Sequence, residues 1–330
     1  MDKNLLKAMR SGAVSLDLEL DDDDELVETI AREDGVFFIT LKKIIRLRSP
    51  SELYPDLNYD AVPLEKSLFL PHGAADPLVA RTVIQTARMA GLFFSKEEKK
   101  YNILSDISWE LMRSVVSLRF IKDRLEGQTN EIVTIIQKDM EAYTIGQSPK
   151  TLPIIEYYDI EFRSFVNEVR RGLNAVSELF FPLIGVKFSS GHFHRAQEWA
   201  ESTLGQGSDL AQMLRRDQRW IATWIDIRTA IEHPKKDKFV ETLNFSLEPG
   251  RTIRLPTWRF VHPDYDMNRP QNLLTVLDIC INNILKFYED IQVVLIGVHL
   301  SKTMHFLAEV IPEDQRDPKL PFRYNFTRFN

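Results

Sequence analysis

The sequence has little cysteine and no long apolar run, and both absences restrict the class of protein. Cys280 is the single cysteine among 330 residues, which excludes an internal disulfide framework and is typical of a reducing compartment. The longest apolar runs, such as QVVLIGVHL at 292–300, are far too short to cross a bilayer. The opening residues MDKNLLKAMRSG lack the apolar stretch of a secretory signal. We therefore expect a cytoplasmic protein that does not bind a membrane.

The sequence also lacks the common motifs that bind cofactors. It has no phosphate-binding P-loop and no serine nucleophile elbow. LGQGSDL at 204–210 imitates half a dinucleotide-binding loop, but no predicted strand precedes it, so a helix C-cap is the better interpretation. The histidines of GHFHRAQE (191–198) are not joined by the further ligands that complete a metal site. HPDYD (262–266) alternates like a metal-binding segment, but it follows a predicted strand and contains a proline, so a turn is the better interpretation. We expect neither a cofactor nor a metal ion.

Negative charge is concentrated at one end of the chain. The formal net charge is −6, and residues 1–34 alone contain eleven acidic residues and four basic ones. This run predicts a solvated acidic arm over residues 1–34. Residues 215–259, in contrast, contain ten lysines and arginines against six acidic residues. The centre of the chain is therefore compatible with a polyanion as partner.

Residues 35–150 are predicted to form a small α+β region of unknown role. GVFFITLKKIIRLR at 35–48 is rich in β-branched and aromatic residues, which is typical of strands. The proline-rich stretch 49–77 predicts a long loop. Asp76 and Pro77 then predict the start of a helix that continues to about residue 94, and a second helical stripe ends at Gly127. The turn residues of GQSPKTLP at 146–153 give the best internal boundary.

Residues 151–330 are predicted to form a mostly helical domain. Apolar residues recur at spacings of three or four from about residue 157 to residue 180, and again from about 270 to 298. Between these stretches, Ser208 predicts the cap of a helix that stops at Pro234. Residues 239–261 alternate around Pro249 and Gly250 and predict a β-hairpin. The tail from Ile311 is interpreted as an irregular extension.

Arg228 and His233, in WIATWIDIRTAIEHPKKDK at 220–238, are the candidate catalytic pair. Five residues turn an ideal helix by about 500°, so the two side chains lie about 140° apart and do not share one face. Pro234 disfavours helical geometry at His233, which allows the imidazole to point differently. A histidine exchanges protons near neutral pH, and an arginine offers a fork of donors to phosphate oxygens. Together they suffice for metal-free attack of an RNA 2′-hydroxyl on the neighbouring phosphodiester.

A structural interpretation of the same residues stays open. Arg228 and Glu232 are four residues apart and can form an ion pair within one helix, while His233 caps its C-terminal end. The tryptophans Trp220 and Trp224 either stack on RNA bases or belong to the helical core. The basic residues that surround the pair are candidates for nucleic-acid binding: Arg215, Arg216, Arg219, Lys235 and Lys236.

DIRTAIEHPK resembles the motif of the HEPN superfamily, in which an arginine precedes a histidine by several residues. IEFRSFVNEVRRGLNAVSELF, at 160–180, is similar to the first bundle helix of bacterial HEPN-like proteins, and FVETLNFSL resembles extensions found in some of them. The resemblance covers about residues 157–300. It implies that Arg228 contacts the scissile phosphate and that His233 acts in proton transfer or in phosphate stabilisation. Many active members carry Asn, Asp or His after the arginine, whereas this chain has Thr229, a third candidate catalytic residue whose hydroxyl can hydrogen-bond with a shorter reach.

The resemblance also implies a fold and a set of partners. The predicted fold class is mainly α, with a C-terminal HEPN-like helical bundle that carries a β-hairpin insertion, preceded by a small α+β N-terminal region. Such bundles dimerise, which would bring Arg228 of one chain to His233 of the other. The function implied is a metal-independent ribonuclease that cleaves single-stranded RNA, in defence or toxin–antitoxin systems with an antitoxin or another protein partner. The alternatives are a non-catalytic module that binds RNA, a nucleotide or a protein, and a purely structural helical protein.

Overall fold

The chain folds into two compact units, seen here in a computed structural model that describes residues 18–48, 65–138, 151–188, 191, 193–248, 252–300 and 305–329. Unit 1 comprises residues 1–95 together with 306–329, and unit 2 comprises residues 96–305. Unit 1 is thus discontinuous in sequence, because the chain returns to it after completing unit 2.

Unit 1 contains a four-stranded antiparallel sheet in the order β1-β2-β3-β4. The strands span Leu26–Arg32, Gly35–Thr40, Ile44–Arg48 and Glu65–Leu70. Every residue of β2 is buried, so both faces of this strand are covered. One face packs Val36 and Phe38 together with Ile45 and Leu47, and Leu18 and Leu20 pack against this cluster.

The remaining elements of unit 1 come from two distant parts of the sequence. A short helix α3 (Pro77–Val79) continues through a π-helical turn, η2 (Ala80–Ile84), into α4 (Gln85–Phe93). The Asp76 carboxylate accepts the backbone N–H of Leu78 at 2.8 Å, so the predicted cap is confirmed. Strands β10 (His305–Val310) and β11 (Tyr324–Phe329) pair, with the 3₁₀ turn η4 (Glu313–Gln315) between them. The Gln85 side-chain oxygen accepts the N–H groups of Arg323 and Tyr324 at 3.0 Å each, which fixes β11 to α4.

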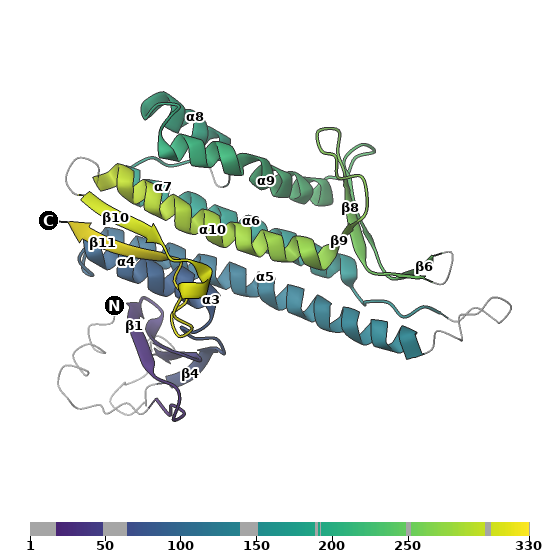
Figure 1. The fold of residues 1–330 in the computed structure, drawn as a ribbon, viewed down its shortest axis with the longest axis horizontal. Coiled ribbons are helices and arrows are strands. Elements are labelled where there is room, and N and C mark those ends of the chain that lie inside the picture. The colour runs from purple at the N-terminus through teal and green to yellow at the C-terminus, as the bar shows by residue number, and fades with distance from the viewer. Residues whose placement is uncertain are drawn as a thin grey trace, which may run out of the picture. The chain divides into compact units, whose positions relative to one another are not determined.

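Unit 2 is built on four long helices that pack together, α5 (Lys99–Lys138), α6 (Tyr158–Glu178), α9 (Asp209–Glu232) and α10 (Leu273–Leu300) (Figure 1). Two shorter helices, α7 (Phe180–Ile184) and α8 (Phe193–Thr203), complete it, and α8 packs along α9. The side chain of Ser208 accepts the N–H of Ala211, so the predicted start of α9 is confirmed.

An aromatic cluster anchors α9 in the core of unit 2. The ring of Trp224 lies 5.9 Å from Phe165 and 6.3 Å from Trp258, and Trp258 lies 5.2 Å from Phe162. Trp258, Phe162 and Phe165 are almost completely buried, and Trp224 is only 8% exposed. Trp220 is less buried, and its indole N–H donates to Asp217 at 3.1 Å. The tryptophans therefore belong to the core and its margin rather than to an exposed stacking surface.

Short strands lie at the end of the helical bundle where α9 finishes (Figure 1). β5 (Phe239–Leu243) pairs antiparallel with β8 (Thr257–Val261), and β9 (Gln271–Asn272) pairs with the other edge of β8. β6 (Ser246–Glu248) and β7 (Thr252–Arg254) form a second antiparallel pair. The predicted hairpin over 239–261 is therefore present, although its turn at Pro249–Gly250 lies outside the described residues.

The predicted fold class, mainly α with a HEPN-like bundle, is wrong. The chain is about 55% helix and 20% strand, with several antiparallel sheets including the four-stranded one near the N-terminus. The strands that the prediction missed are short and contain charged residues. Their sequences do not alternate clearly between apolar and polar residues, and the strands are stabilised by pairing with neighbouring strands. β4, for example, lies inside the stretch interpreted as a loop, β1 inside the predicted acidic arm, and β11 in the tail interpreted as irregular.

The predicted helix end at Gly127 is also wrong, because α5 continues through this glycine for eleven further residues to Lys138. The cost of a glycine within a helix is only about 1 kcal/mol. Buried Leu125, Ile132 and Ile136 extend the apolar stripe across it and compensate for that cost. Most of the boundary predicted at 146–153 lies in residues 139–150, outside the described part of the chain.

Candidate functional site

The candidate site lies at the C-terminal end of α9, where the chain changes from helix to turn. α9 ends at Glu232, and the backbone N–H of His233 still donates to the carbonyl of Thr229 at 2.8 Å. His233 has left the helical region, with φ −132° and ψ 65°, as its position before Pro234 predicts. The end of the helix is therefore set by the proline and leaves the histidine side chain exposed.

Arg228 forms the ion pair of the structural interpretation. Its guanidinium lies 2.7 Å from the carboxylate of Glu232, one turn further along α9, and both side chains are a little over one-third exposed. The hydroxyl of Thr229 donates to the carbonyl of Ile225 at 2.8 Å, so it bonds within the helix. Within the described residues, the imidazole of His233 has no hydrogen-bond or ion-pair partner. The three candidate catalytic residues thus lie near one helix end, but Arg228 and Thr229 bond to other residues of α9, and neither bonds to His233.

A tight turn with two lysines follows this helix end. The backbone groups of Lys235 and Lys238 bond to each other in both directions, at 2.7 and 3.1 Å. Lys235 and Lys236 are exposed, and neither ammonium group has an ion-pair partner in the part of the chain that the structure describes. Asp237, in the same turn, is an exposed carboxylate that offsets one of these charges. Both ammonium groups are therefore accessible to a ligand, in a turn whose net charge Asp237 reduces.

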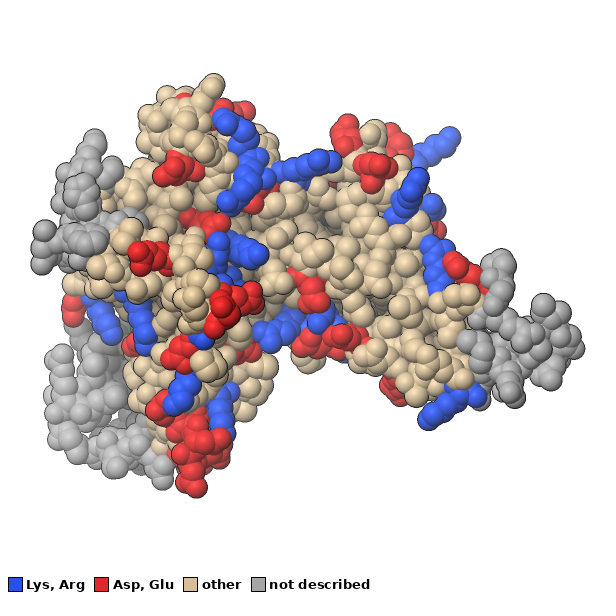
Figure 2. Space-filling model, in the orientation of Figure 1, with Lys and Arg blue, Asp and Glu red and all other residues tan. Residues whose placement is uncertain are grey.

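The three arginines in the first half of α9 are placed differently. Arg215 pairs with Glu201 of α8 at 2.7 Å, and Arg216 pairs with Asp217 and with Asp290 of α10 at 2.7 and 3.1 Å. Arg219 is exposed on the same helix. Figure 2 shows basic side chains gathered over α8 and α9, with acidic ones among them. Much of the positive charge that the sequence places here is already neutralised.

A polar clamp, which sequence reasoning missed, holds the end of α9 to the neighbouring strands. One carboxylate oxygen of Asp226 accepts Lys238 Nζ at 3.0 Å, and the other accepts the hydroxyl of Tyr265 at 2.8 Å. Burial and the Asp226 carboxylate raise the pKa of Tyr265 to about 12, so the phenol stays protonated and donates at neutral pH. Because Tyr265 is 39 residues from Asp226, no local pattern could have predicted this contact.

His262 packs against Tyr265 of the clamp. It is 8% exposed, and its ring lies 4.9 Å from that of Tyr265 and 5.2 Å from that of Phe260. Its Nδ1 accepts the backbone N–H of Asp264 at 3.1 Å. The HPDYD segment is thus a turn packed on α9. Within the described residues, no group of three His, Cys, Asp or Glu side chains is arranged to hold a metal ion; His192 lies outside them.

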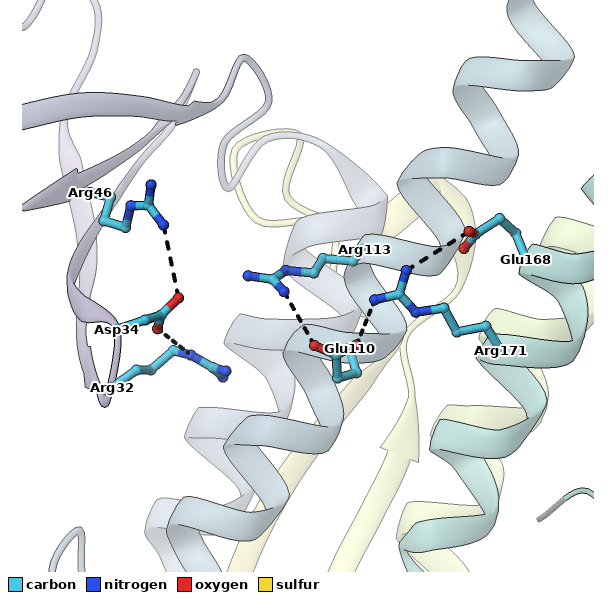
Figure 3. Close-up of polar contacts among 7 residues, drawn as sticks. All are labelled: Arg32, Asp34, Arg46, Glu110, Arg113, Glu168 and Arg171. Carbon is cyan, nitrogen blue, oxygen red and sulfur yellow. Dashed lines mark hydrogen bonds and ion pairs between the residues drawn. The ribbon is translucent and has the colours of Figure 1, made fainter. Parts of the chain in front are cut away.

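Other charged clusters form alternating networks in which each cation meets a carboxylate (Figure 3). In unit 2, Glu110 of α5 accepts from Arg113 and, at 2.8 Å, from Arg171 of α6, which also lies 3.8 Å from Glu168. In unit 1, Asp34 lies 3.5 Å from Arg32 and 3.9 Å from Arg46 across the sheet. The unit 2 pairs are partly exposed and contribute little each, whereas Arg32 and Arg46 are mostly buried.

A small apolar pocket in unit 2 does not coincide with the end of α9. No charged side chain lines it, and its lining residues are Leu125, Thr129, Tyr158, Leu255, Pro256, Asn272, Leu273 and Leu274. Burial raises the pKa of Tyr158, whose hydroxyl donates to the carbonyl of Thr257 at 3.3 Å. The pocket lacks a cationic side chain that would balance the charge of a phosphate.

Two negative findings accompany this geometry. In the described part of the chain, no helix is both long enough and apolar enough to span a membrane. No family model, no curated protein and no solved structure matches the chain. The resemblance to the HEPN superfamily therefore stays a prediction that depends on the residues of the motif.

Proposed function

We propose that the end of α9 binds single-stranded RNA. The observation that carries this proposal is the pair Lys235 and Lys236, two exposed ammonium groups that have no ion-pair partner among the described residues. They lie in the turn that follows the arginine and the histidine of the motif, so several cations are presented together. RNA phosphates bind to such groups with release of counterions, which makes the binding dependent on salt.

RNA is favoured over a nucleotide and over a metabolite by the openness of this surface. The basic groups lie along an exposed helix end and turn, whereas a nucleotide requires an enclosed site with donors that fix its orientation. The one pocket described above in unit 2 has no charged residue in its lining. A flexible strand that carries a phosphate on every nucleotide can instead contact separated cations along its length.

Cleavage of the bound RNA is a second candidate function, and it is favoured by the accessibility of His233. The imidazole is exposed and has no partner among the described residues, so it is free to take a proton from a ribose 2′-hydroxyl. Two contacts argue against efficient chemistry in the free protein. Arg228 is engaged by Glu232, and the Thr229 hydroxyl bonds to Ile225.

RNA binding is tested by fluorescence anisotropy with a labelled single-stranded RNA over a series of salt concentrations. We expect Lys235→Ala/Lys236→Ala to weaken binding about tenfold at low salt and to make the salt dependence shallower, because two phosphate contacts are lost. The matched control is Arg215→Ala/Arg216→Ala, which removes the same charge from groups that are already paired and should change affinity less than about twofold. Equal losses in the two double variants, or no binding by the wild type, would contradict the proposal.

Cleavage is tested with the same RNA in EDTA. A HEPN-type reaction should leave a 2′,3′-cyclic phosphate, and Arg228→Ala and His233→Ala should each abolish it without a change in melting temperature. Binding without any product would eliminate the catalytic candidate and leave the binding function in place.

A further inference from the structure

Arg228 has one ion-pair partner among the described residues, Glu232, and this carboxylate occupies donors that an anionic ligand would use. The two side chains meet at 2.7 Å, and both remain a little over one-third exposed, so the pair is open to an incoming ligand. Carboxylate and phosphate oxygens compete for the same donors of a guanidinium group. An RNA phosphate that contacts Arg228 must therefore displace the Glu232 carboxylate.

Helix stability does not account for an acid at this position. Glu232 is the last residue of α9, at the end where the helix dipole is negative, and a carboxylate there is unfavourable. The order of the pair is also the weaker one, because an acid four residues before a base stabilises a helix better than the reverse. Exposed pairs of this kind contribute little in any case.

Other cations accompany Arg228, and Asp237 adds one exposed carboxylate in the turn that follows. Arg170 of α6 is close enough for the charge of Arg228 to lower its pKa, in addition to the larger effect of burial. Lys235 and Lys236 follow within a few residues. Loss of the Glu232 charge would leave a cluster of cations that attracts a phosphate more strongly.

We propose that Glu232 is an internal competitor of RNA: its carboxylate occupies Arg228 in the free protein and is displaced when an RNA phosphate binds. This inference rests on the proposed function and adds a regulatory element to the same site. Glu232 limits the affinity for RNA and keeps weak anions away from Arg228.

The test is Glu232→Gln, which removes the charge and keeps the size of the side chain. We expect RNA to bind about three- to tenfold more tightly at low salt, with a steeper salt dependence that corresponds to about one additional phosphate contact. The gain should vanish in the double variant Glu232→Gln/Arg228→Ala. The matched control is Glu201→Gln, since Glu201 pairs with Arg215 at the same distance of 2.7 Å elsewhere on the surface. This control should change affinity less than about twofold.

The outcomes separate this inference from the proposed function. RNA binding could depend on Lys235 and Lys236 while Glu232→Gln gives no gain in affinity, or only the gain seen in Glu201→Gln. The gain could also persist when Arg228 is replaced. Each of these results would overturn the role of Glu232 as a competitor and leave the binding function in place. If neither the wild type nor Glu232→Gln binds RNA, both are overturned. A melting temperature that falls in Glu232→Gln, with unchanged affinity, would show that the ion pair is structural.

Discussion

The two ends of α9 carry similar positive charge in the sequence and differ in how that charge is used. In the first half, Arg215 and Arg216 lie against carboxylates, two of which come from α8 and α10. Beyond the last turn, Lys235 and Lys236 are exposed and have no partner among the described residues. The number of basic residues in a window therefore overstates the charge that a ligand can reach.

The difference arises from packing rather than from composition. α8 lies along the first half of α9 and brings Glu201 to Arg215, while α10 supplies Asp290. In the turn after Glu232, the Asp226 clamp holds Lys238, whereas Lys235 and Lys236 are exposed. Arginines in the first half thus stabilise the contact between helices, and lysines beyond the last turn are left for binding.

The largest effect on stability is expected from Trp224→Ala. Trp224 anchors α9 in the core of unit 2, and both ends of the helix depend on this packing. The indole packs on Phe165 and Trp258, and its loss should lower the free energy of unfolding by about 3–5 kcal/mol. Urea denaturation measures this change, with Trp220→Ala as a milder control because Trp220 is only partly buried. If Trp224→Ala lowered the free energy of unfolding less than Trp220→Ala does, the aromatic cluster around Trp224 would not be what positions the two ends of α9.

A smaller effect on stability should distinguish the two ends of α9. Arg216→Gln loses ion pairs with Asp217 and Asp290 and should destabilise the protein by about 0.5–1 kcal/mol, because the side chain is mostly exposed. Lys236→Gln has no pair to lose and should leave the free energy of unfolding unchanged. Urea denaturation of the two variants measures both changes. A loss of stability in Lys236→Gln would contradict the difference between the paired arginines and the unpaired lysines.

The smallest effect concerns His299, whose Nε2 lies 3.4 Å from the ammonium nitrogen of Lys100. Burial, followed by the charge of Lys100, lowers the pKa of His299 below its ordinary value. The unfolded state therefore takes up the proton more readily, so the contribution of His299 to stability is complete above about pH 6.5 and falls as the pH drops toward the lowered folded-state value. Melting temperatures between pH 7.5 and 5.5 should fall less in His299→Gln than in the wild type. Identical curves would mean that His299 does not titrate differently in the two states.

The sequence predicted the local features of the site because short-range chemistry determines them. Ser208 and Pro234 mark the ends of α9, and the spacing of Arg228 and Glu232 predicts their ion pair. Asp76 likewise predicts the start of α3. Each of these features depends on residues within one turn of each other.

Features that depend on distant residues were missed. Glu201 and Asp290 neutralise arginines of α9 from other helices, and Tyr265 reaches Asp226 across 39 residues. Strands β4 and β11 have no clear alternation and exist through their pairing with β3 and β10. The continuation of α5 through Gly127 was missed because packing along the helix outweighs a local propensity.

The bond between Gln85 and β11 links the beginning of the chain to its end in the order of synthesis. Gln85 leaves the ribosome early, and the N–H groups that it accepts belong to Arg323 and Tyr324, translated more than two hundred residues later. Unit 2, which is continuous in sequence, can complete its contacts during that interval, whereas unit 1 must wait with α4 uncovered by β11. Released chains truncated shortly before residue 320 should therefore contain a finished helical unit and an incomplete first unit that holding chaperones recognise.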